Sequence, residues 1–328
     1  MKGSIIITTH NRPHSLRRAI ASAFAAGRHV EVIVVDDAST DETAKLCASI
    51  EGIEYVRVER NQGVAGARNI GLLASRGEFI SFLDDDDLRL PNSLDQQIEA
   101  LSKSPAAMLC YAQAIPQNQT GEPGPPFPAA CPQGDVFWEL LERNFIPCGS
   151  VVFRRECVTR VGLLDDRISR IDDWDLWLRI TELFPVVSLE APVLIWRQPT
   201  RASSQGSSDT IDVIHLAISH FRKSCLRLPR VVNATRRQRR DSWRAFSLNF
   251  ADHLAWEAFR SLYFANVRRA WTCACTLLRL HPIVFIHLWR SGTRASAINA
   301  FIAQRFTSPE IESVKIRLKE IRSIPDSR

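Results

Sequence analysis

Residues 78–87 read EFISFLDDDD, a short apolar run that ends in four consecutive acids. The run predicts a buried strand over 78–84. Four adjacent carboxylates repel one another unless a cation lies among them. Because oxygen ligands completed by substrate phosphates usually hold Mg²⁺ or Mn²⁺, the stretch indicates a metal and diphosphate site. The alternative is a solvated acidic turn before a helix start at 88–91, which is the commoner fate of acid runs.

Strand-like and helical patterns alternate around this run. The segments 4–8, 30–36 and 53–58 predict strands, and 14–26, 41–50, 64–75 and 93–102 predict helices. The alternation predicts an α/β fold with a mostly parallel, Rossmann-like sheet flanked by helices on both faces. Ligands of such sheets bind beyond the carboxyl ends of the strands.

The downstream half is less regular. A Pro- and Gly-rich stretch predicts a long loop over 116–132. Helices are expected at 135–143, 154–161 and 174–184, with short strands at 150–153 and 186–195. The Ser-rich stretch 200–209 predicts a hinge, and several helices are expected from there to the end of the chain.

A second acid pair, Asp36 and Asp37, ends the strand predicted at 30–36. A carboxylate there accepts hydrogen bonds from a base or a ribose, or it merely caps the following helix. Both acid clusters end strands of one sheet, so we expect them to converge on one crevice. Between them, the small residues of 61–69 allow close approach of a ligand, and Arg68 supplies a cation; helix packing is the simpler interpretation.

A third cluster, Asp172 and Asp173, lies at a helix start. One of these carboxylates is placed to accept a proton from an acceptor hydroxyl if this start faces the metal site, and helix capping is the alternative. Trp174 and Trp177 recur on one apolar helical face, so the pattern favours core packing over sugar binding.

The order of these motifs resembles the family-two inverting glycosyltransferases with the GT-A fold, over roughly residues 3–200. The motifs are the run 5–12, the strand end at Asp36 and Asp37, the loop 63–71, the cluster that begins at Asp84 and the helix at Asp172. The resemblance implies a GT-A domain over 1–200, with a nucleotide-binding half at 1–115 and an acceptor half at 133–200. A basic helical region over 201–328 follows.

The resemblance also assigns roles residue by residue. It implies that Asp173 is the catalytic base, that Asp86 ligates Mn²⁺ or Mg²⁺, and that Asp172 and Arg179 are candidates for support. The implied donor-binding residues are Thr9, Asn11, Asp37, Arg68, Asp84 and Asp85. The chain departs from the family pattern at three positions, with Thr8 for proline, His10 for tyrosine and Asp172 for glutamate.

The implied reaction moves a sugar from a nucleotide-diphosphate sugar to an acceptor hydroxyl with inversion, in surface polysaccharide or glycolipid synthesis. The acceptor is expected to be a glycan or a lipid-linked glycan. A catalytically silent nucleotide-sugar-binding scaffold with a basic interaction tail stays open as the alternative. A phosphotransferase is disfavoured, because the only lysines before residue 200 are Lys2, Lys45 and Lys103, none beside a strand-end motif.

Charge divides the chain unevenly. Residues 1–200 hold 20 Lys and Arg against 27 Asp and Glu, a net charge of −7, whereas residues 201–328 hold 22 against 9, a net charge of +13. The basic part includes Arg236, Arg237, Arg239 and Arg240, with Trp243, Trp256, Trp271 and Trp289 nearby. These residues predict contact with an anionic membrane surface; nucleic acid is the disfavoured partner, and a solvated face or a homo-oligomer contact stays open.

The ends and the cysteines bear on location. The first residues are too strand-like for a signal peptide, and eight cysteines without a CxxC spacing fit a reducing cytosol. The apolar segment 270–289 is interrupted by Arg279, His281 and Pro282, which makes it a poor bilayer span. We therefore expect a cytoplasmic protein, peripheral on the inner face of the membrane.

Overall fold

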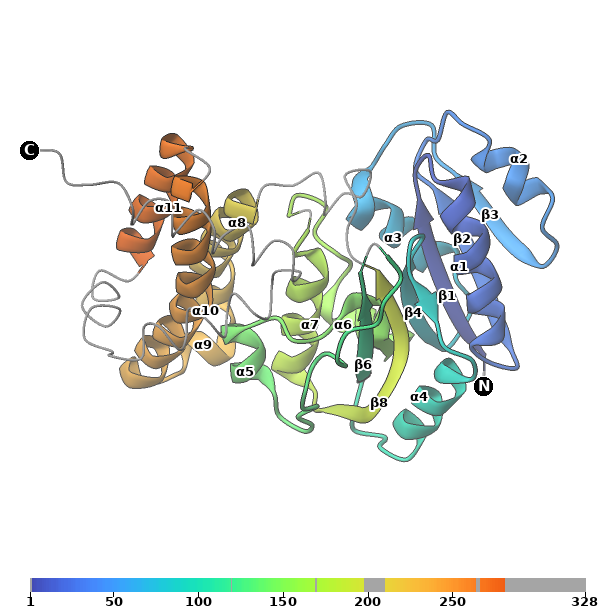
Figure 1. The fold of residues 1–328 in the computed structure, drawn as a ribbon. Coiled ribbons are helices and arrows are strands. Elements are labelled where there is room, and N and C mark those ends of the chain that lie inside the picture. The colour runs from blue at the N-terminus through green and yellow to red at the C-terminus, as the bar shows by residue number, and fades with distance from the viewer. Residues whose placement is uncertain (1, 119, 169, 198–209, 264–265, 281–328) are drawn as a thin grey trace, which may run out of the picture. The chain divides into compact units, whose positions relative to one another are not determined.

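The computed structural model describes residues 2–118, 120–168, 170–197, 210–263 and 266–280 (Figure 1). The chain forms two compact units, Met1–Asn249 and Phe250–Arg328. In the first unit, an eight-stranded mixed sheet has the order β3-β2-β1-β4-β7-β6-β8-β5. The predicted α/β fold with helices around one sheet is confirmed.

The first half of the sheet is parallel. It contains β1 (Gly3–Thr9), β2 (Val30–Asp36), β3 (Ile53–Arg57) and β4 (Phe79–Asp84). Their parallel register aligns Thr9 with Asp36, and Thr8 with Asp84. The helices between them are α1 (Pro13–Ala25), α2 (Thr43–Ala48) and α3 (Gly63–Ala74). All seven elements lie where the sequence predicts them, and the acid clusters at the ends of β2 and β4 flank the end of β1.

The second half of the sheet is mixed. The strand β7 (Val151–Arg154) pairs antiparallel with β4 and β6 (Leu109–Gln117), and β8 (Val186–Arg197) runs parallel to β6. The two-residue strand β5 (Leu88–Arg89) pairs with β8. Three helices complete this half: α4 (Ser93–Ser102), α5 (Phe137–Glu142) and α7 (Asp172–Leu183).

Two predictions for this half are wrong in detail. The sequence predicts no strand at Leu109–Gln117 and places its last two residues in the long loop, whereas both of them pair with β8. The alternative of a helix start at 88–91 is not observed either, because Leu88 and Arg89 form strand β5 and pair with β8. The helix expected at 154–161 divides into a 3₁₀ turn, Arg155–Cys157, and the single turn α6 (Val158–Val161), which Gly162 ends with φ of 80°.

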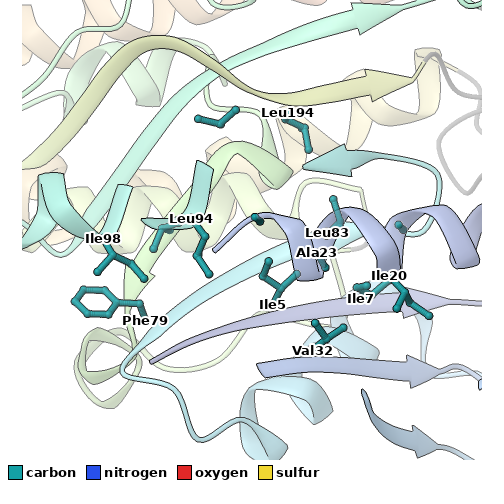
Figure 2. Close-up of a cluster of buried hydrophobic side chains, with 14 of the residues drawn as sticks. Ile5, Ile7, Ile20, Ala23, Val32, Phe79, Leu83, Leu94, Ile98 and Leu194 are labelled. Atoms are coloured by element: carbon teal, nitrogen blue, oxygen red, sulfur yellow. The ribbon is translucent and has the colours of Figure 1, made fainter. Parts of the chain in front are cut away.

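One face of the sheet is covered by α1, α2 and α4. Alternation along the strands sends Ile5 and Ile7 of β1 toward this face, where they are fully buried. Figure 2 shows them with Ile20 and Ala23 of α1, and Leu94 of α4 packs in the same cluster. Burial of each such side chain contributes about 1.5–3 kcal/mol.

The opposite face is covered by α3 and α7. Gly71 of α3 lies so close to the sheet that a Cβ there would stand 2.2 Å from Ile6 Cγ2. Trp177 of α7 is fully buried against Phe82 and Phe153, with ring centroids 6.5 and 5.8 Å away. Trp174 is buried too, so the prediction that both tryptophans belong to the core is confirmed. This packing fixes the start of α7, which carries two of the acids, against β4.

The C-terminal region is helical in the part that the structure describes. It contains α8 (Thr210–Lys223), α9 (Pro229–Val232), α10 (Arg236–Tyr263) and α11 (Val267–Leu280). The predicted hinge at 200–209 and everything beyond Leu280 lie outside the described residues, so the domain boundary at 200 stays a prediction. In the described segments, no helix is both long and apolar enough to cross a membrane.

Candidate active site

The loop after β1 is tied to the acids after β4. Thr9 donates a hydrogen bond from its hydroxyl to Asp85 Oδ2 at 2.7 Å. The Arg12 guanidinium bonds Asp85 Oδ1 at 2.7 Å and Asp86 Oδ2 at 3.1 Å. Arg12 was not predicted from the sequence to be a site residue. Its position could have indicated a role, because it follows β1, and β1 pairs with the strand whose end carries the four acids.

The four acids that begin at the last residue of β4 alternate between buried and accessible positions. Asp85 and Asp87 are buried, each with 4% of its surface exposed. The Asp84 and Asp86 side chains keep 32% and 25% of theirs. A tight turn, in which Asp87 N–H donates to the Asp84 carbonyl at 3.1 Å, produces this alternation. The two accessible carboxylates are therefore the pair spaced as Asp-x-Asp.

Burial and repulsion from neighbouring carboxylates disfavour the charged forms of Asp85, Asp86 and Asp87. Burial raises the pKa of Asp85 to about 6, although Arg12 opposes the shift. Burial, and then the charge of Asp84, raise the pKa of Asp86. The same two causes raise the pKa of Asp87, whose Oδ1 accepts a hydrogen bond from Arg197 N at 2.9 Å. A cation would relieve this repulsion.

A divalent cation fits this carboxylate pair only with help from substrate. In the described residues, no group of three or more His, Cys, Asp or Glu side chains could hold a metal. Mg²⁺ commonly takes one or two protein carboxylates and completes its shell with water and phosphate oxygens. The accessible Asp86 and its neighbour Asp84 suit that type of site.

The two acids after β2 differ in environment. Asp36 is fully buried and accepts hydrogen bonds from Ser39 N at 2.8 Å and Tyr55 Oη at 2.6 Å, so it shapes the turn. Asp37 accepts a hydrogen bond from Gln62 N at 2.6 Å, which ties the β2 end to the start of α3. Burial raises the pKa of Asp37.

Asn11 connects the loop after β1 to the loop after β2. It adopts the left-handed conformation with φ of 56°, which asparagine tolerates better than most residues. Its N–H donates to Ser39 Oγ, and its Oδ1 accepts a hydrogen bond from Thr40 N at 2.8 Å. Asn11 therefore shapes the edge of the site through the loop after β2.

Arg68 lies at the centre of the site. It is 5% exposed, and its two terminal nitrogens bond Asp84 Oδ1 at 2.8 Å and Asp172 Oδ2 at 2.9 Å. Its guanidinium also lies over the ring of Phe82, 5.4 Å from the centroid. One buried cation thus joins the strand-end acids to the first turn of α7.

Asp173 adjoins this ion pair and is partly exposed. In the part of the chain that is described, its one hydrogen bond is to Trp174 N, at 2.7 Å from Oδ1. Burial, and then the charge of Asp172, raise the pKa of Asp173 to about 7, while Arg68 opposes the shift. A carboxyl group that titrates near neutrality suits general acid–base chemistry.

Two further residues bear on the site. Arg179 bonds Asp175 and the carbonyls of Val161 and Leu163, so it supports the loop between α6 and α7. The Cys148 thiol lies in the electrostatic environment of Arg68 and Asp173, and burial raises its pKa well above the ordinary value. Sequence reasoning missed Cys148, because it is far from Asp173 along the chain and follows no strand-end pattern.

Comparison with known proteins identifies a matching family. Residues 4–161 match the family model described as "Glycosyl transferase family 2". The succinoglycan biosynthesis proteins ExoO and ExoU of Rhizobium meliloti are 41% identical over 99 residues and 29% identical over 189 residues, covering 29% and 53% of this chain. An uncharacterized glycosyltransferase of Rickettsia typhi is 28% identical over 56% of the chain. The matches span 28%, 55% and 59% of these three relatives' own lengths.

Solved structures show the same fold. S. aureus TarS superposes with a TM-score of 0.55 at 16% identity, over 78% of this chain and 44% of that one. TarS 1-349 in complex with UDP-GlcNAc gives 0.52 at 15% identity, over 83% and 90%. The match to the family model assigns residues 4–161 to glycosyltransferase family 2.

Proposed function

We propose that the chain transfers a sugar, with inversion, from a nucleoside-diphosphate sugar to the hydroxyl of a glycan or lipid-linked acceptor. The observation that carries the proposal is the cluster of Asp84, Arg68, Asp172 and Asp173. In this cluster, the accessible pair of Asp84 and Asp86 lies beside Asp173, whose pKa is raised to about 7.

The comparisons support a nucleotide-sugar donor. TarS has been solved with UDP and with UDP-GlcNAc. In our proposal, Thr9, Asn11 and Asp37 line the nucleotide end of the site, directly or through the loops they fix. Arg68, Asp84 and Asp85 lie toward the diphosphate and the sugar. The succinoglycan relatives support a pathway of polysaccharide synthesis.

The proposed cofactor is Mn²⁺ or Mg²⁺ held by Asp86. When bound, such an ion stabilises the negative charge that develops on the leaving diphosphate. The charge of Asp84 raises the pKa of Asp86, and a divalent cation beside the two carboxylates would relieve their repulsion.

Asp173 is the proposed base. Its carboxylate takes the proton of the acceptor hydroxyl while the oxygen attacks the anomeric carbon, and the bond to the nucleoside diphosphate breaks. A single displacement of this kind inverts the anomeric configuration. Asp172 holds the turn before α7 rather than reacting, since both of its oxygens are engaged, by Arg170 N and by Arg68.

A donor screen tests the proposal. Purified full chain is incubated with Mn²⁺, pooled glycan acceptors and single nucleotide sugars, beginning with UDP-GlcNAc, and release of nucleoside diphosphate is measured. We expect acceptor-dependent release with at least one donor, and its loss in Asp173→Asn. Donor binding without turnover across the screen would instead support the silent scaffold.

The basic region is proposed to contact an anionic membrane surface from the cytoplasmic side. Arg237, Arg240 and Arg244 line one shallow groove on α10 together with Leu248, which is 42% exposed. Exposed arginines beside an apolar side chain suit the headgroup region of a bilayer. Trp243 instead packs on Phe221 and Phe246, and Trp271 is 71% exposed. The Trp256 side chain and Trp289 lie outside the described residues.

A further inference from the structure

Three segments far apart in the sequence meet at one guanidinium. Arg68 comes from α3, Asp84 from the end of β4 and Asp172 from the first turn of α7, 16 and 104 positions away. A planar guanidinium bonds two carboxylates in two fixed directions, which a lysine ammonium does not reproduce. Arg68 therefore fixes the distance between the donor-side acid and the start of α7.

The backbone turn just before α7 depends on the contact between Arg68 and Asp172. Asp172 Oδ1 accepts a hydrogen bond from Arg170 N at 3.1 Å, and Arg170 has a φ of 82°, in the left-handed region. Such a conformation costs free energy in an arginine and persists only where neighbouring contacts hold it. The other Asp172 oxygen is held by Arg68, so one contact secures both the turn and the helix start.

We propose, on the basis of the function proposed above, that Arg68 is a positioning residue for the reaction. By holding Asp172, it sets where the Asp173 carboxylate points and places a positive charge beside that carboxylate.

The electrostatics of the cluster support this assignment. Burial and Asp172 raise the pKa of Asp173 to about 7, and Arg68 is the cation that lowers it. The groups that surround Asp173 are Asp172 on its own helix, Arg68 on α3, Asp84 at the end of β4 and the thiol of Cys148. Loss of Arg68 would leave three carboxylates together without the cation that bonds two of them, and an opposite charge at this range typically shifts a pKa by about one to three pH units.

Direct titration of Asp173 tests the proposal without any substrate. The full chain is labelled with ¹³C at aspartate carboxyl carbons, Asp173→Asn identifies the signal, and its chemical shift is followed against pH. We expect Arg68→Met to raise the pKa of Asp173 by about one pH unit or more. Arg68→Lys should raise the pKa of Asp173 by an intermediate amount, because lysine keeps the positive charge but cannot bond Asp84 and Asp172 in the same two directions.

The matched control is Arg154→Met. Arg154 also lies over a phenylalanine ring, 5.3 Å from the centroid of Phe79, and bonds the carbonyls of Leu101 and Ala107. These contacts do not involve the acids of the site, so the substitution should leave the pKa of Asp173 unchanged. An equal shift in Arg154→Met, or an unchanged titration in Arg68→Met, would overturn the proposal.

A second variant keeps the test independent of how well Arg68→Met folds. Asp172→Asn removes a negative charge beside Asp173 and should move its pKa downward, opposite to the Arg68 variants. If an active donor is known, the acidic limb of kcat/KM should move with the measured pKa in each variant. A chain that turns over no donor would contradict the proposed function, while the titration would still decide the role of Arg68.

Discussion

Arginine side chains have different environments at two places in this protein, the carboxyl end of strand β4 and the start of α10. At the end of β4, the Arg68 side chain is 6% exposed and lies within 2.9 Å of two carboxylates. On α10, the Arg237 and Arg240 side chains are 86% and 76% exposed, and their partner Asp241 stands 3.6 and 3.4 Å away. Buried ion pairs are costly and hold fixed geometry, whereas exposed pairs contribute about 0–1 kcal/mol.

The difference indicates how each region works. Fixed buried charges shift the pKa values of their neighbours, which suits a reaction at one point. Exposed arginines in the first turns of a helix oppose the helix dipole and add to a positive field that reaches a surface. The two regions should therefore respond to different variables. Activity at the site beside β4 should depend on pH and metal, and membrane binding by α10 should depend on salt and anionic lipid.

The largest effect is expected from Asp173→Asn. Removing a general base typically costs about 10²- to 10⁴-fold in rate, and we expect kcat to fall about 1,000-fold while donor binding persists. Stopped assays of diphosphate release and donor titration by calorimetry measure the two quantities. Asp166→Asn, at an exposed neighbouring position, serves as control and should retain normal turnover. Near-normal kcat in Asp173→Asn would remove Asp173 from the mechanism.

Asp86→Ala should lower kcat about 100-fold, because a lost electrostatic contact to a developing charge is of that order. It should also abolish the response to added Mn²⁺, measured as activity against metal concentration. Asp95→Ala is a matched control, since the Asp95 side chain is 31% exposed and paired with Arg28 outside the site. An unaltered metal response in Asp86→Ala would show that the ion, if required, is held elsewhere.

The pH dependence should report Asp173. Because this group must be ionised to accept a proton and its pKa is about 7, kcat/KM should fall about tenfold per pH unit below neutrality. Its pKa is raised on folding, so its contribution to stability is fully present below the unfolded value and is lost as pH rises toward 7. Asp173→Asn should therefore raise Tm relative to wild type more at pH 8 than at pH 5. The opposite order would mean that the carboxylate is stabilised rather than penalised by burial.

The smallest effect is expected on α10. Each of Arg237→Gln and Arg240→Gln should weaken binding to vesicles containing phosphatidylserine about fivefold, since one basic residue near an anionic surface contributes about 1 kcal/mol. Vesicle flotation at two salt concentrations measures this, and kcat with a soluble acceptor should not change. Arg28→Gln, at another position with an 85% exposed side chain, should bind vesicles normally. Equal binding by all variants would contradict a membrane role for this face.

Local pattern was sufficient for the parallel half of the sheet. The strands β1 to β4 are continuous apolar runs and the helices between them have clear lengths, so each element was predicted near its observed bounds. Strand β6 was missed because its polar and small residues, and Pro116, lack a strand period and acquire their pairing from β7 and β8.

By itself, the sequence determined the α/β fold, the family resemblance and the presence of acids at strand ends, because these depend on short-range periodicity and on the order of motifs. Only the tertiary structure decided which acids are accessible, that Arg12 binds Asp85, and that Arg68 joins Asp84 to Asp172. These contacts join segments 16 to 104 residues apart, and burial sets the charge of each group. Which of four consecutive acids are withdrawn from water is decided only when the layers pack.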